Sequence, residues 1–199
     1  GPGSGLGVSG VLPRPGDEAG NGGPGNGGPG NGGWVALSGE GGHATMAACD
    51  DREAEVLAAL RGRFGHVSAE RVLSGPGLAA LYAALAEVNG DLLKEPPEAA
   101  EITANGMSGS DALAVETLEL FCALLGTTAG NLALTLGAAG GVLVAGGIVP
   151  RLGERFARSP FRARFEDKGR LRPYLEKIPT AVVTHPLPAF LGLMQALEN

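Results

Sequence analysis

Hydrophobic positions recur at helical spacing over three stretches in the first half of the chain. Between 52 and 64 the apolar residues fall on one face of a helix, and Asp50 and Asp51 are suitable caps for its first turn. The residues of that face are Val56, Leu57, Leu60 and Phe64. The same pattern predicts further helices over 68–73 and 78–88.

The longest helical pattern follows Ser110, which we expect to cap it. Its repeating positions are Leu113, Thr117, Phe121, Leu124, Thr128 and Leu132. Gly126 and Gly130 lower the intrinsic stability of such a helix. We therefore expect close packing against a neighbouring element to hold it.

Short apolar runs bounded by glycine turns predict strands between the helices. The expected strands lie within 1–12, 34–37, 141–148 and 181–184, and further helices at 151–157 and 189–197. This alternation predicts an α/β fold with a mostly parallel or mixed sheet. The stretch 132–149 carries no charge, but five glycines interrupt it, so we predict a helix end, a turn and a buried strand rather than a membrane span.

Chain length favours one main domain, because 199 residues suffice for one good core. Residues 21–33 repeat Asn-Gly-Gly-Pro-Gly and have no side chains that bury apolar surface, which predicts a flexible insertion at a hairpin tip.

The charge balance excludes some partners. A net charge of −6 argues against broad binding to nucleic-acid phosphates, which needs clustered Lys and Arg.

Cys49 and Cys122 suit a reducing compartment, where both are expected to be buried as small hydrophobes. No secretion signal or membrane segment is apparent, so a cytoplasmic location is expected. His66 and His185 lack neighbours at metal-ligand spacing, so we predict no metal site.

Three polar residues are candidates for binding hydroxyl groups. Glu40 and His43 stand in a glycine turn at a strand end, where a carboxylate and an imidazole suit adjacent sugar hydroxyls. A solvated turn is the alternative interpretation. Glu70 is a possible third group near a helix start, although a carboxylate there also stabilises the helix dipole.

Two glycine clusters are candidates for binding a nucleotide. Gly3, Ser4 and Gly5 offer backbone N–H groups and a hydroxyl that can cradle phosphate oxygens; Gly-Pro-Gly-Ser is also a sequence left after tag removal. Gly146 and Gly147 follow a predicted strand and leave room for adenine or ribose against bare backbone. Tight strand–helix packing is the alternative for that pair.

In order and spacing, five segments together resemble the bacterial glucokinase family of the hexokinase and actin-like ATPase superfamily. They are Gly-Ser-Gly-Leu-Gly at 3–7, Glu-Gly-Gly-His at 40–43, 66–77, Ala-Gly-Gly-Ile-Val-Pro at 145–150, and 161–169. The resemblance implies a ribonuclease H-like large α/β domain with a mixed sheet over 1–186 and a C-terminal helix over 187–199. It also implies a parent enzyme that uses ATP and Mg²⁺ to phosphorylate glucose at the 6-hydroxyl, commonly as a homodimer.

By this resemblance, Glu40, His43 and Glu70 bind glucose hydroxyls, Gly3, Ser4 and Gly5 approach the ATP phosphates, and Gly146 and Gly147 border the adenosine. The family usually has threonine where Ser4 stands, and serine keeps the hydroxyl.

The resemblance also implies what this chain lacks. The small domain, its first phosphate loop and the aspartate that acts as catalytic base are expected before Gly1, and the 187–199 helix would return to that domain. We therefore expect the chain to be inactive alone.

Two other functions stay open. One is a sugar-responsive transcription regulator of the related repressor–kinase family, although such relatives usually carry a Cys-rich zinc motif after the equivalent of Glu40–His43. Only Cys49 follows that turn here, and the chain shows no basic helix-turn-helix. The other is a non-catalytic sugar-binding module.

Overall fold

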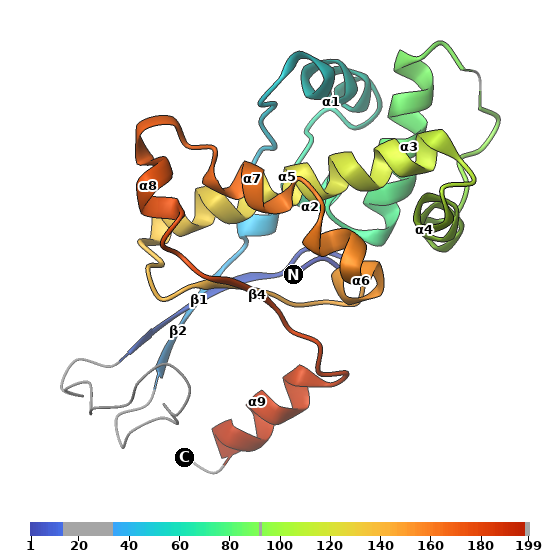
Figure 1. The fold of residues 1–199 in the computed structure, drawn as a ribbon. Coiled ribbons are helices and arrows are strands. Elements are labelled where there is room, and N and C mark those ends of the chain that lie inside the picture. Colours follow the sequence, from blue (N-terminus) through green and yellow to red (C-terminus); the bar gives the residue numbers. More distant parts are fainter. Residues whose placement is uncertain (14–33, 92, 198–199) are drawn as a thin grey trace.

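A computed structural model describes residues 1–13, 34–91 and 93–197 as a mixed α/β fold of mostly helices with small sheets (Figure 1). The predicted insertion at 21–33 lies outside the described residues. The strands are β1 (Val8–Pro13), β2 (Trp34–Gly39), β3 (Val142–Val144) and β4 (Thr180–Val182). The helices are α1 (Asp51–Phe64), α2 (Ala69–Val72), α3 (Gly75–Val88), α4 (Ala99–Ser108), α5 (Ala112–Leu136), α6 (Val149–Ala157), α7 (Phe161–Glu166), α8 (Arg172–Leu175) and α9 (Pro188–Leu197), with short 3₁₀ turns η1 (Gly41–His43) and η2 (Gly169–Leu171).

The strands form two separate pairs. β1 and β2 run antiparallel, with Val8 opposite Gly39, and β3 and β4 run parallel. The described residues thus contain both strand orientations, in two small sheets instead of one larger sheet. The strand predicted within 141–148 is β3, but it spans only three residues and is not buried throughout: Leu143 is 72% exposed while Val144 is buried. Alternate side chains of a strand point to opposite faces, and only one face of β3 is covered.

Side-chain caps set the starts of the early helices. Asp50 accepts a hydrogen bond from the backbone N–H of Glu53, as predicted for α1. Ser68 caps α2 in the same way. α3 begins three residues before its predicted start, because Ser74 provides the cap. Caps with this chemistry satisfy backbone donors that the helix itself leaves free.

One detail of the helix predictions is wrong. Asp111, not Ser110, caps α5, accepting from the backbone N–H groups of Leu113 and Ala114. A carboxylate at the N-terminus satisfies those donors and interacts favourably with the helix dipole. Phe64 ends α1 with 41% of its surface exposed, and its ring lies 4.4 Å below the Arg71 guanidinium. The side chain therefore covers the surface between α1 and α2 rather than filling the core.

The helix α5 runs through the middle of the molecule, with α7 packed along it (Figure 1). A Cβ at Gly126 would lie 2.2 Å from the carbonyl oxygen of Phe161, and one at Gly130 would lie 2.5 Å from that of Phe165. The two glycines therefore let the two backbones touch, which confirms the close packing expected for them. Large side chains that are fully buried in this core include Leu57, Leu60, Leu81, Leu118, Phe121, Leu124 and Phe165.

By length and composition, α5 alone among the described helices could cross a membrane. Its most apolar 18-residue window is 61% buried within the fold, however, and aromatic and aliphatic side chains of the core surround it. The apolar character of α5 is thus explained by its central position.

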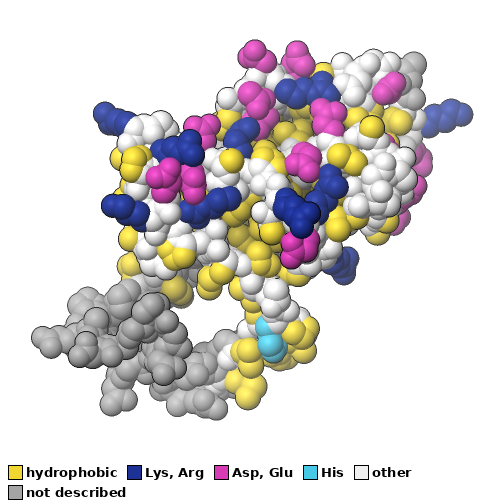
Figure 2. Space-filling model, in the orientation of Figure 1, with side chains coloured by type: hydrophobic (Ala, Val, Ile, Leu, Met, Phe, Trp, Pro, Cys, Tyr) yellow, Lys and Arg dark blue, Asp and Glu magenta, His cyan; other side chains and the backbone are white. Residues whose placement is uncertain are grey.

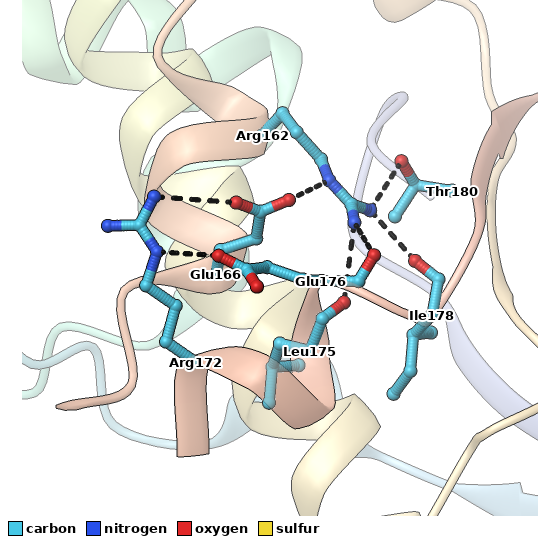
Figure 3. Close-up of polar contacts among 7 residues, drawn as sticks. All are labelled: Arg162, Glu166, Arg172, Leu175, Glu176, Ile178 and Thr180. Carbon is cyan, nitrogen blue, oxygen red and sulfur yellow. Dashed lines mark hydrogen bonds and ion pairs between the residues drawn. The ribbon is translucent and has the colours of Figure 1, made fainter. Parts of the chain in front are cut away.

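Arg162, on α7, anchors the loop that follows α8 (Figure 3). Its guanidinium donates to the carbonyl oxygens of Glu176 and Ile178 at 3.0 and 2.8 Å, and it pairs with Glu166 one turn along the same helix. Further acceptors are the Leu175 carbonyl and the Thr180 hydroxyl. One side chain thereby holds the end of α8 and the start of β4 in place.

The two cysteines lie in different environments. Cys122, on α5, is buried as predicted, whereas Cys49 is exposed in the segment before α1, so that prediction is wrong. The N–H of Cys49 donates to the buried Glu53 carboxylate, and its Sγ is 3.5 Å from the Thr127 hydroxyl. Local polar contacts hold this residue at the surface.

The C-terminal helix α9 extends away from the helical body (Figure 1). Charged side chains cover the body, whereas hydrophobic side chains gather on the arm that carries α9 (Figure 2). More than half of the surface of Leu187, Phe190, Leu191 and Met194 is exposed. An apolar surface of this kind is typical of a segment that packs against another domain or chain.

Candidate functional site

Glu40 and His43 project from one tight turn at the end of β2. The turn is held by a hydrogen bond from the His43 N–H to the Glu40 carbonyl, and it continues into the 3₁₀ turn η1. Both side chains are largely exposed, at 90% for Glu40 and 60% for His43, and the nearest carboxylate oxygen lies 4.0 Å from Nε2. A carboxylate and an imidazole are therefore presented together to solvent.

Glu70 approaches the same imidazole from the first turn of α2. Its Oε1 lies 3.9 Å from Nε2 of His43, so both carboxylates lie within 4.0 Å of the same ring nitrogen. A short ladder joins the two segments: the N–H of Ala69 donates to the carbonyl of Ala44, and the N–H of Met46 donates to that of Val67. The three predicted hydroxyl-binding residues thus form one cluster.

The N-terminal glycine turn, residues 1–6, lies directly against this cluster. The N–H of Leu6 donates to Oε2 of Glu70 at 2.9 Å. On the other side of the same residue, a Cβ at Gly42 would lie 2.1 Å from the Leu6 carbonyl oxygen. The N–H of Gly75, at the start of α3, donates to the carbonyl of Gly3. Ser4 is exposed at the tip of this turn.

Gly146 and Gly147 border the glycine turn from the side of β3. Gly146 has a φ of +99°, which favours glycine, and a Cβ there would lie 2.2 Å from the carbonyl oxygen of Pro2. Gly147 is exposed, and a Cβ there would meet open space. The first of these glycines therefore serves backbone packing, and the second leaves the surface beside the turn open.

The candidate sugar-binding residues and both candidate glycine clusters therefore lie together around residues 1–6. The structure adds three residues that sequence reasoning missed, namely Leu6, Gly42 and Gly75, which act through their backbones. Glycine spacing was the only available signal for the last two. His66 lies beside the cluster, with Nε2 3.0 Å from the hydroxyl of Thr45. Throughout the described part of the chain, no three His, Cys, Asp or Glu residues are grouped as metal ligands.

The arrangement offers two kinds of recognition side by side. Two carboxylates can accept hydrogen bonds from neighbouring hydroxyl groups, and the imidazole near both can donate or accept. The adjoining glycine turn presents backbone with no side chains in the way, as phosphate-binding turns do. The fold and this site define a mixed α/β protein that carries a cluster of two carboxylates and an imidazole beside a glycine turn.

Known proteins resemble this chain in sequence and in fold. A family profile described as Glucokinase matches residues 1–199, which includes Gly1–Ser4. A glucokinase of Paramagnetospirillum magneticum is 52% identical over 97% of this chain and 55% of its own length. The crystal structure of a glucokinase from an Antarctic psychrotroph superposes with a TM-score of 0.80 at 37% identity, covering 94% of this chain and 53% of that one.

A Balamuthia mandrillaris glucokinase, crystallised in complex with glucose, shares the fold with a TM-score of 0.69 at 20% identity, over 93% of this chain and 49% of its own. The chain belongs to the glucokinase family. It spans about half the length of the curated glucokinases that it matches.

Proposed function

We propose that this chain is the large-domain part of an ATP-dependent glucokinase that phosphorylates the 6-hydroxyl of glucose. Residues 1–186 make up a ribonuclease H-like large domain in this proposal. The convergence of Glu40, His43 and Glu70 beside the glycine turn is the observation that carries it. Sugar hydroxyls and nucleotide phosphates must lie next to each other for phosphoryl transfer, and these segments bring their two binding surfaces together.

The carboxylates of Glu40 and Glu70 accept hydrogen bonds from glucose hydroxyls in this proposal, and His43 binds a hydroxyl between them. The spacing supports this assignment, because both carboxylates lie within 4.0 Å of the same imidazole nitrogen. Charge-assisted hydrogen bonds of this kind fix both the position and the orientation of a sugar.

The nucleotide occupies the neighbouring surface. Gly3, Ser4 and Gly5 approach the ATP phosphates, and Gly146 and Gly147 border the adenosine. The bare backbone at Gly147 and the exposed hydroxyl of Ser4 support this assignment. Mg²⁺ would neutralise phosphate charge. The described residues contain no group of three His, Cys, Asp or Glu residues that could hold a metal ion.

The remaining parts of the enzyme lie outside these residues in this proposal. The catalytic base belongs to a small domain that precedes Gly1, which fits a chain about half as long as its relatives. Residues 187–199 pack against that domain, and the exposed apolar side chains of α9 support this. A homodimer and a cytoplasmic location are proposed from family membership alone.

Isothermal titration of glucose into this chain, with a coupled assay for glucose 6-phosphate, tests the proposal. We expect saturable binding without turnover. Glu40→Ala should weaken binding by about tenfold or more, as expected for a lost hydrogen bond to a charged group. Glu154→Ala is the matched control, because Glu154 is an exposed carboxylate on α6, away from the cluster.

Two results would contradict the proposal in different ways. ATP-dependent turnover by the chain would place the base within these residues and disprove the predicted division of the enzyme. A folded chain that shows no saturable glucose binding would disprove the sugar site itself.

A further inference from the structure

Glu70 uses its two carboxylate oxygens for different purposes. Oε2 accepts the N–H of Leu6, in the glycine turn, while Oε1 faces His43 at 3.9 Å. About one third of the Glu70 side chain is exposed, so the carboxylate stands between the buried residue Leu6 and solvent. A carboxylate fixed by a backbone N–H on one oxygen has little freedom to rotate, and its second oxygen is held in a defined direction.

We propose that Glu70 is a positioning residue that couples the sugar site to the phosphate-facing glycine turn, an inference that rests on the proposed function. A sugar hydroxyl bound to Oε1 restrains the carboxylate and, through Oε2, the Leu6 peptide. The restraint extends to the turn, since residue 6 directly follows Gly5. Coupling of this kind is reciprocal: a ligand on the turn changes the affinity for the sugar by the same factor as the sugar changes the affinity for that ligand. A displaced turn is therefore expected to weaken sugar binding.

Gly5 makes the inference specific. A Cβ at this position would lie 2.6 Å from Oε2 of Glu70 and 3.3 Å from its carboxyl carbon. Its φ is not in the left-handed region, so alanine would create no backbone strain and would act only by displacing the carboxylate. A residue of the proposed phosphate turn is therefore expected to control affinity for the sugar.

Hydrogen exchange of the Leu6 amide tests the connection without any ligand. In the wild-type chain this amide should exchange slowly, and in Glu70→Ala it should exchange about tenfold faster, as expected for a lost hydrogen bond to a charged acceptor. Glu70→Gln should restore much of the protection, because its amide oxygen can still accept. Glu40→Ala, which removes the other carboxylate, should leave Leu6 unchanged. Equal Leu6 exchange in the wild type and Glu70→Ala would overturn the inference.

Calorimetric titration of glucose into Gly5→Ala tests the coupling itself. We expect about tenfold weaker binding than in the wild type, the effect of one lost charged hydrogen bond. Gly39→Ala is the matched control, because a Cβ at that glycine meets nothing within 4 Å; its affinity should stay within about twofold, the effect of an ordinary surface substitution.

Wild-type affinity in Gly5→Ala would overturn the inference while leaving the proposed function intact. Absence of glucose binding in the wild-type chain would instead disprove the proposed function, and the sugar half of this inference with it.

Discussion

The hydroxyl group of Tyr82, on α3, donates a 2.8 Å hydrogen bond to Oδ2 of Asp111, whose other oxygen caps α5. One carboxylate therefore joins two core helices and completes the N-terminus of one of them. Burial of Tyr82, followed by this hydrogen bond and the charge of Asp111, raises the pKa of Tyr82 to about 12.

Ionisation of Tyr82 should lower the free energy of unfolding as pH rises from about 10 to about 12. The unfolded tyrosine loses its proton near 10.0, whereas the folded one keeps it to about 12, so the unfolded state binds fewer protons in that range. Urea unfolding at several pH values should show a weaker pH dependence in Tyr82→Phe than in the wild type. Tyr174→Phe is the control, because that tyrosine is exposed. Parallel curves for Tyr82→Phe and the wild type would contradict the prediction.

Gly42→Ala should disrupt the site without changing any side chain that faces it. The Cβ would collide with the carbonyl oxygen of Leu6, so the turn that holds Glu40 and His43 must move. We expect a loss of about 1–3 kcal/mol in the free energy of unfolding, typical of overpacking, together with weaker glucose binding. Gly39→Ala should change neither quantity. Unaltered binding by Gly42→Ala would show that the two turns are not packed together.

Gly126→Ala and Gly130→Ala should each destabilise the fold. Either Cβ would press against a backbone carbonyl of α7, and we expect about 1–3 kcal/mol lost per substitution in urea denaturation. Gly62→Ala provides the opposite control, because that helical glycine on α1 meets nothing within 4 Å. Higher helix propensity should stabilise it by about 0.5–1 kcal/mol. If all three substitutions changed the free energy of unfolding in the same direction, the packing of α5 against α7 would be refuted.

The two cysteines should differ in their reactivity with a thiol reagent. Burial raises the pKa of Cys122 to about 11, whereas Cys49 is exposed. One thiol per native chain should therefore react with Ellman's reagent at pH 8, and both should react in denaturant. Cys49→Ser should remove the native reaction and Cys122→Ser should leave it. Fast reaction of both native thiols would contradict the burial of α5.

Local sequence determined much of the early helical structure. Asp50 and Ser68 begin α1 and α2 as expected, because a cap needs only a suitable side chain and the N–H groups two or three residues later. The paired strands β1 and β2 also follow from apolar runs on either side of a turn-rich segment. α4 and α7 escaped prediction, because short helices derive most of their stability from tertiary packing.

The sequence by itself also singled out the segments of the candidate site, since glycines and polar residues at Glu40–His43 and Glu70 stand out without any structure. It could not show that these segments meet, because Leu6 and Glu70 lie 64 residues apart and their contact depends on how α2 packs. Only the tertiary structure decided that Gly42 packs closely against the Leu6 carbonyl and that Cys49 is exposed. The physical reason is that burial and close backbone contacts depend on neighbours distant in sequence, whereas capping and periodicity depend on adjacent residues.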